Sequence, residues 1–146
     1  GNVPVEAMDM EFDFFRVGEY ALREDSGGAG KHRGGLGFRR AYHILEDDVT
    51  FATYSDRFRL APEGLFGGAD GARAQTHVLR GEERIPLPSK TSFALKKGDI
   101  LVTETGGGAG YGIPAERGRG EVERDLREGF ISPGAAGQYG TAEAAE

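Results

Sequence analysis

Cysteine and tryptophan are both absent from this sequence of 146 residues. Without thiols, the chain can form neither a disulfide nor a thiolate metal site. No apolar run approaches the length of about twenty residues that a membrane-spanning helix needs. The opening GNVPVEAMDM also lacks the basic and apolar segments of a signal peptide. We therefore expect a cytoplasmic location and no membrane partner.

Large apolar side chains are scarce as well. Leu, Ile, Val and Phe together make up about a fifth of the chain, which is close to the fraction at which disorder is suspected. Glycine, in contrast, accounts for 25 residues, and each glycine costs additional backbone entropy when the chain orders. The composition predicts that the chain gains much of its stability by docking against a larger partner, because a bound partner stabilises the folded state.

The charge pattern argues against a nucleic-acid partner. The formal net charge is -6 at pH 7, and acidic and basic residues are interspersed, whereas phosphate binding requires a basic face.

The length of the chain fits one domain. Within it we expect a mainly-β part (residues 1–113), a helical appendix (114–140) that packs on it or on a partner, and a flexible tail (141–146).

Alternating apolar and polar residues predict a series of strands. Strands are expected at residues 10–17, with a possible continuation through Leu22, and at 37–45, 49–54, 77–79 and 93–95. Residues 55–71 are expected to form an ordered loop. The fold class predicted is mainly β, as a small sandwich- or barrel-like antiparallel sheet with Gly-rich loops and a short C-terminal helical segment.

Two further patterns concern turns and the helix. SFALKKGDILVTE predicts a hairpin in which residues 93–95 pair with 100–102, because Gly98 supplies a left-handed turn residue. GEVERDLREG (120–129) places Val122 and Leu126 on one face and ends at Gly129, which predicts a helix of two turns. Ser132 then resembles a helix N-cap.

The stretch DSGGAGKHRGGLG (25–37) carries basic residues among six glycines. It fails the Walker pattern, because Asp25 stands at the first glycine position and His32 at the hydroxyl position. Two readings stay open: a concave nest of amides that binds an anion, or turns and close backbone contacts that only glycine allows. The candidate anion-binding or subunit-interface residues are Ser26, Gly27, Gly28, Gly30, Lys31, Arg33, Asp56, Arg57 and Arg59.

A second glycine-rich loop contributes Gly106, Gly107, Gly108, Gly110 and Tyr111. The histidines, His32, His43 and His77, do not stand at the spacing of zinc ligands. We identify no catalytic and no metal-ligating residue in the sequence, and we expect no cofactor bound by this chain.

Five motifs occur in an order that identifies a family. They are DSGGAGKHRGGLG, SDRFRLAPEGLFGG, LPSKTSFALKKGD, ETGGGAGYG and RDLREGFIS. Together they resemble the carboxyl-terminal part of the hydantoinase B/oxoprolinase family, from about Asn2 to Ser132. The sequence departs from the family pattern at Gly106, Ala109 and Ile113, where the family usually has proline, glycine and aspartate.

The resemblance implies larger hydantoinase A-like and hydantoinase B-like partner subunits. ATP and a divalent metal (magnesium, manganese or zinc) are expected in those subunits. No catalytic residue of the family maps onto this chain. As a separate chain it resembles the small, structural subunit of an ATP-dependent, biotin-independent carboxylase of the acetophenone carboxylase type, which would make the complex a ligase. The alternatives are a C-terminal fragment or subunit of an ATP-dependent hydantoinase, 5-oxoprolinase or lactamase, and an autonomous anion-binding module.

Overall fold

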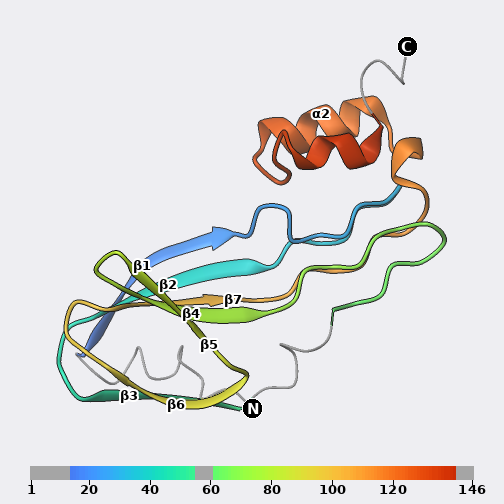
Figure 1. Cartoon of the computed structure of the whole chain (residues 1–146). Helices are drawn as coiled ribbons and strands as arrows, with labels where there is room; N and C mark the ends of the chain where they lie inside the picture. The colour runs from blue at the N-terminus through green and yellow to red at the C-terminus, as the bar shows by residue number, and fades with distance from the viewer. Residues whose placement is uncertain (1–13, 55–60, 141–146) are drawn as a thin grey trace. The chain divides into compact units, whose positions relative to one another are not determined.

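The computed structural model describes residues 14–54 and 61–140. These residues form two compact units, and each unit combines stretches that are far apart in the sequence. Unit 1 contains the described residues among 1–21, 39–59 and 74–105, and unit 2 those among 22–38, 60–73 and 106–146. Figure 1 shows the strands of unit 1 and the loops and helices of unit 2. The linear boundaries at residues 113 and 140 stay a prediction.

Unit 1 is built from two antiparallel sheets. The larger sheet has the order β1 (Phe15–Leu22), β2 (Phe38–Ile44), β7 (Ile100–Glu104), β4 (Gln75–Arg80) and β5 (Glu83–Leu87). The smaller sheet pairs β3 (Val49–Tyr54) with β6 (Lys90–Leu95). The predicted mainly-β class is confirmed. The described strands form no closed barrel, so the barrel-like alternative is wrong.

The core of unit 1 joins both sheets. Val78 of β4 and Leu101 of β7 are buried in the larger sheet, and Leu95 of β6 belongs to the same apolar cluster. Phe15 packs its ring edge against Tyr42, with the ring centroids 5.6 Å apart. Burial of apolar surface on facing sides of two sheets is the arrangement of a small sandwich.

The predicted hairpin around Gly98 is wrong in its pairing, although its turn is correct. Gly98 has a φ of +93°, as a left-handed turn residue should. However, β6 pairs with β3, and β7 pairs with β2 and β4, so the two strands belong to different sheets. Strand β5 was not predicted at all. It contains Pro86 and lies at the edge of the sheet, where a missing N–H is tolerated.

Unit 2 contains three extended loops that are hydrogen-bonded to one another through their backbones. The Gly28 amide donates to the Gly108 carbonyl (2.9 Å), Ala69 donates to Ala29 (2.7 Å), and Gly110 donates to Ala69 (2.9 Å). In Figure 1 these loops run beside one another as blue, green and orange segments. The loops therefore satisfy one another's backbone groups without belonging to a regular sheet.

Glycine is required where these loops approach most closely. A Cβ atom at Gly107 would overlap the carbonyl oxygen of Ser26, and one at Gly34 would overlap the carbonyl oxygen of Gly108. Both obstacles are backbone atoms, which cannot swing aside as a flexible side chain can. The reading of glycine as a residue chosen for close contact is therefore supported.

Three short helices follow the loops in unit 2: η1 (Pro114–Glu116), α2 (Arg119–Arg127) and η2 (Ala135–Tyr139). The predicted helix at 120–129 is confirmed as α2, and Gly129 has the left-handed φ of +75° that ends it. Ser132 accepts a hydrogen bond from the Ala135 amide through Oγ (3.1 Å), but the N-cap position of η2 is Gly134, so the predicted N-cap is wrong by two residues. No helix among the described residues is long and apolar enough to cross a membrane.

Candidate subunit interface

Ser26 is buried and holds the first glycine loop in shape. Its hydroxyl donates to the Arg23 carbonyl (2.6 Å) and accepts from the Gly37 amide (2.8 Å). The side chain is 1% exposed. Ser26 thus ties the two ends of the loop together across eleven residues, and both hydrogen-bonding capacities of its hydroxyl are used within the chain.

Several amides of the first glycine loop donate to carbonyls inside the unit. Gly28 donates to Gly108, Lys31 donates to Gly112, and Gly34 donates to Gly28, at distances between 2.9 and 3.3 Å. An anion-binding nest needs amides that point together toward a free space. These three amides point to carbonyl groups instead, so they favour the structural reading, and the anion site stays a prediction.

Arg33 is the predicted residue with the most extensive contacts. Its Nε donates to Oδ2 of Asp125 (3.1 Å), and its Nη2 lies 3.4 Å from Oδ1. Arg117 approaches the same carboxylate, with Nε and Nη2 each 3.1 Å from Oδ2. Two guanidinium groups therefore share one carboxylate, and we call this group the Asp125 clamp.

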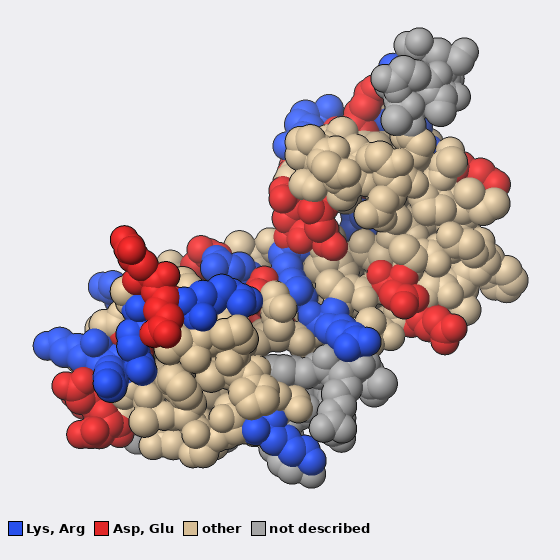
Figure 2. Space-filling view, in the orientation of Figure 1, with Lys and Arg blue, Asp and Glu red and all other residues tan. Residues whose placement is uncertain are grey.

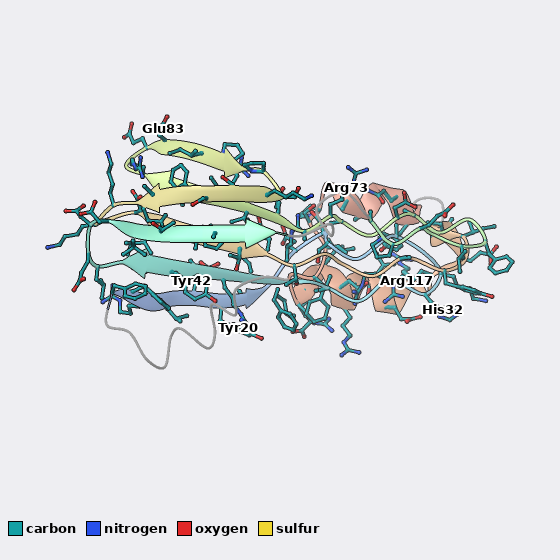
Figure 3. The ribbon with its side chains drawn as sticks, turned by 90° about the horizontal axis from the view of Figure 1, so that it is seen from below. Tyr20, His32, Tyr42, Arg73, Glu83 and Arg117 are labelled. Carbon is teal, nitrogen blue, oxygen red and sulfur yellow. The ribbon has the colours of Figure 1, made fainter. Side chains whose placement is uncertain are left out.

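The Asp125 clamp connects α2 to the first glycine loop. Arg117 also donates to the Lys31 carbonyl (3.1 Å), and Arg33 donates to the Gly34 carbonyl (2.9 Å). Figure 3 labels Arg117, together with His32, which follows Lys31 in the chain. The side chains of Asp125, Arg117 and Arg33 are 4%, 9% and 14% exposed. A carboxylate this buried requires such partners, because an unpaired buried charge is costly.

Tyr139 lies in the same electrostatic environment. Its hydroxyl is buried and finds no hydrogen-bond partner among the residues that the structure describes. Burial raises the pKa of Tyr139, and the positive charges of Arg117 and Arg33 oppose that rise. The phenol is thereby held in its neutral form next to the clamp.

The remaining predicted residues fall into four groups. Gly27 and Gly30 lie against backbone atoms, because a Cβ at Gly27 would overlap the Gly34 carbonyl oxygen and one at Gly30 would lie 2.7 Å from the Tyr111 amide nitrogen. Gly107, Gly110 and Tyr111 take part in the backbone bonding of the loops, whereas the Gly106 position is exposed. Asp56, Arg57 and Arg59 lie outside the described residues. The structure therefore brings the two glycine-rich loops together and leaves the predicted surface ion pairs without a test.

Sequence reasoning missed the acidic residue that the clamp depends on. Asp125 lies three residues after Val122 and one before Leu126, both of which pack in the small core of unit 2. A carboxylate on the apolar face of a short helix is a signal that a charged partner covers it. The partner itself, Arg33, is 92 residues away in the chain.

Unit 1 has a polar pair of its own. Arg80 donates to both carboxylate oxygens of Asp99, from Nε (2.9 Å) and Nη2 (2.7 Å), and the Lys96 amide also donates to Asp99 (2.8 Å). The hydrogen bonds from Arg80 lower the pKa of Asp99. This pair fixes the turn that begins β7.

The described histidines do not assemble into a metal centre. No group of three or more His, Asp or Glu residues within 14–54 and 61–140 could hold a metal ion.

His77 is buried in β4 at 6% exposure. Burial, and then the positive charge of Arg84, lower its pKa. Over unit 1, Figure 2 shows basic and acidic side chains beside one another on the visible face.

A comparison with known protein families identifies the family of this chain. The model of the family described as hydantoinase B/oxoprolinase matches residues 1–114. The chain belongs to the hydantoinase B/oxoprolinase family. The resemblance expected from the five ordered motifs is therefore confirmed, and the match covers both glycine-rich loops.

Two curated relatives illustrate the family. An uncharacterized protein of Methanocaldococcus jannaschii is 41% identical over 131 residues, which cover 90% of this chain and 23% of the relative. The B subunit of a putative D-/L-hydantoinase from a Pseudomonas species is 33% identical over 134 residues, which cover 90% of this chain and 22% of the relative. The chain thus spans less than a quarter of the length of these two relatives.

Two solved structures share the fold. The ATP-dependent caprolactamase of Pseudomonas jessenii matches with a TM-score of 0.77 at 24% identity, covering 93% of this chain and 24% of that one. A nucleotide-free acetone carboxylase matches with a TM-score of 0.69 at 17% identity, covering 99% and 24%. The fold of this segment therefore recurs inside much longer chains.

Proposed function

We propose that this chain is a structural, non-catalytic part of a hydantoinase B-type subunit in an ATP-dependent enzyme complex that hydrolyses cyclic amides. The observation that carries the proposal is the match to the B subunit of a putative hydantoinase over 90% of this chain, while covering 22% of that protein. A segment of this size is expected to form one structural part of a larger protein.

The chemistry of unit 2 supports a structural role. Amides of its loops donate to carbonyls within unit 2, and Arg33 and Arg117 both pair with the buried carboxylate of Asp125. Contacts of this kind hold the loops and α2 in one arrangement, as a structural part requires. We propose that nucleotide and divalent metal bind to the larger hydantoinase A-like and B-like partners.

A chimera tests this role. In the B subunit of the Pseudomonas hydantoinase, the segment aligned with this chain is replaced by this chain, and ATP-dependent opening of hydantoin is measured with the partner subunit present. We expect deletion of the segment to abolish turnover and the chimera to restore it. A chimera that folds and assembles like the parent but does not turn over would refute the proposal, as would turnover by this chain alone.

The carboxylase alternative has one observation in its favour, which is the fold shared with acetone carboxylase. Under this alternative the complex would be of the acetophenone carboxylase type and would fix bicarbonate onto a ketone. Incorporation of labelled bicarbonate with ATP and acetophenone, measured on the native complex, distinguishes the two activities. Carboxylation without hydantoin opening would replace the amidohydrolase proposal.

A further inference from the structure

Four large apolar side chains of unit 2 are exposed together. Leu65, Phe66, Tyr111 and Ile113 are 54%, 74%, 49% and 50% exposed, and we call them the Tyr111 patch. The ring centroids of Phe66 and Tyr111 are 5.1 Å apart. A Cβ built at Gly67, next to Phe66 in the chain, would lie 3.0 Å from the Ile113 side chain. These residues thus form one neighbourhood contributed by two loops.

The backbone beneath the patch is firmly held. The Leu65 amide donates to Gly110 (3.1 Å), and the Gly112 amide donates to Leu65 (2.9 Å). On its other side Tyr111 exchanges two hydrogen bonds of 2.9 Å with His32. Because Tyr111 lies between two bonded neighbours, its ring is presented outward from a rigid base. Preorganisation of this kind lowers the entropy cost of binding a partner.

Phe66 adds a second sign that the patch is built for contact. Its φ is +52°, in the left-handed region that aromatic residues rarely adopt. Burial of the ring does not offset this strain, because the side chain is 74% exposed. Unfavourable backbone geometry that presents a side chain to the outside is typical of a binding element.

We infer that the Tyr111 patch docks onto an apolar surface of the remaining part of a hydantoinase B-type subunit, an inference that rests on the proposed function. In the two curated relatives, 77–78% of the chain lies outside the segment matched here, since that segment covers 23% and 22% of them. A protein surface is the occupant that fits this chemistry. Tyrosine and phenylalanine are enriched in the desolvated centres of protein interfaces.

The Tyr111 patch contains no Lys or Arg side chain, so a polyanion would gain little from it. Docking would bury side chains that the isolated chain leaves in water. It would also add stability to a chain whose folding is opposed by the backbone entropy of many glycines.

Binding in trans tests the surface. The probe is the B subunit of the Pseudomonas hydantoinase without its aligned segment, and its dissociation constant for this chain is measured by calorimetry. We expect the double variant Phe66→Ser/Tyr111→Ser to bind about tenfold more weakly or worse. Leu45→Ser is the matched control, because Leu45 is 40% exposed but lies in unit 1; it should bind as the original chain does.

A labelling experiment on the chimera covers the case in which the truncated probe does not fold. Because the chain has no cysteine, Phe66→Cys introduces a single thiol into this segment, and its maleimide labelling is followed by mass spectrometry. We expect labelling to be slower by about tenfold or more in the chimera than in the free chain.

The outcomes distinguish a failure of the docking surface alone from a failure of the proposed function. An active chimera whose introduced thiol reacts as fast as in the free chain, or equal binding by the double variant, overturns the surface and leaves the function standing. Protection that depends on the concentration of the free chain assigns the patch to self-association and also overturns it. If the probe does not bind and the chimera does not assemble, both the function and the docking surface fail.

Discussion

The substitution Asp125→Ala probes the buried charge that holds α2 to the first glycine loop. The carboxylate is shared by Arg33 and Arg117, and all three side chains are at most 14% exposed. Removing it would leave two guanidinium groups close together, largely out of water and without the buried carboxylate that they share. Breaking a buried ion pair from one side costs about 3–5 kcal/mol.

This cost is large in relation to the whole fold. A domain has a free energy of unfolding of about 5–15 kcal/mol, so we expect Asp125→Ala to remove about a fifth or more of it, or to unfold unit 2 outright. Urea titrations followed by far-ultraviolet circular dichroism would report the loss, because α2 dominates the helical signal. A falling midpoint with an unchanged slope would indicate lost stability, and not a changed unfolding mechanism.

Glu123→Ala is the matched control on the same helix. Glu123 pairs with Arg119 at 3.4 Å, but these side chains are 61% and 52% exposed. Exposed pairs of this kind contribute about 0–1 kcal/mol. If Asp125→Ala lowered the free energy of unfolding by no more than Glu123→Ala does, the clamp would not be a main source of stability in unit 2.

A double-mutant cycle with Arg33→Ala measures the coupling directly. Once Asp125 has been replaced, Arg33 has lost its anionic partner and keeps only the Gly34 carbonyl, so its removal should cost much less than it does in the original chain. Residues in one ion-pair network typically couple by about 0.5–3 kcal/mol. Additive effects would contradict the shared contact between Arg33 and Asp125.

Three further predictions concern packing and titration. Gly107→Ala should destabilise the fold by about 1–3 kcal/mol or more, because the added Cβ would meet the Ser26 carbonyl. Gly35→Ala should be neutral or slightly stabilising, because nothing lies within 4 Å of a Cβ at that position. Thermal unfolding of both variants checks this difference. The lowered pKa of His77 means that the unfolded state binds the proton more tightly; stability should therefore fall as the pH drops below about 6.5, and His77→Asn should flatten that dependence in urea titrations at pH 7.5 and 5.5. Tyr139→Phe removes a buried hydroxyl without a partner in the described part of the chain, so calorimetric melting should show a free energy of unfolding that is unchanged or higher by about 1 kcal/mol; a marked loss would reveal a hydrogen bond that the structure lacks.

Local conformation was largely predictable from the sequence. The strand at 49–54, the helix near 120–129 and the left-handed turn residues Gly98 and Gly129 all occur as expected. Each depends on neighbouring residues: alternation of apolar side chains, spacing on a helical face, or the freedom of glycine. The five ordered motifs were also sufficient to predict the family.

Strand pairing was not predictable in the same way. The turn at Gly98 is compatible with a hairpin, yet β6 joins β3 while β7 inserts between β2 and β4. The choice depends on backbone partners and buried faces far away in the chain, which a local pattern does not contain. Pro86 is compatible with the edge position of β5, but a proline by itself does not predict that its segment forms a strand.

By itself, the amino-acid sequence determined the mainly-β class, the helix, the glycine-rich loops and the family of this protein. Only the tertiary structure decided what the loops do: their amides bond to one another, Arg33 reaches Asp125 across 92 positions, and Leu65 comes to lie beside Tyr111. The physical reason is the distance along the sequence over which each effect acts. Backbone propensity acts over a few residues, whereas close backbone contact, burial of charge and exposure of apolar surface depend on which distant segments meet.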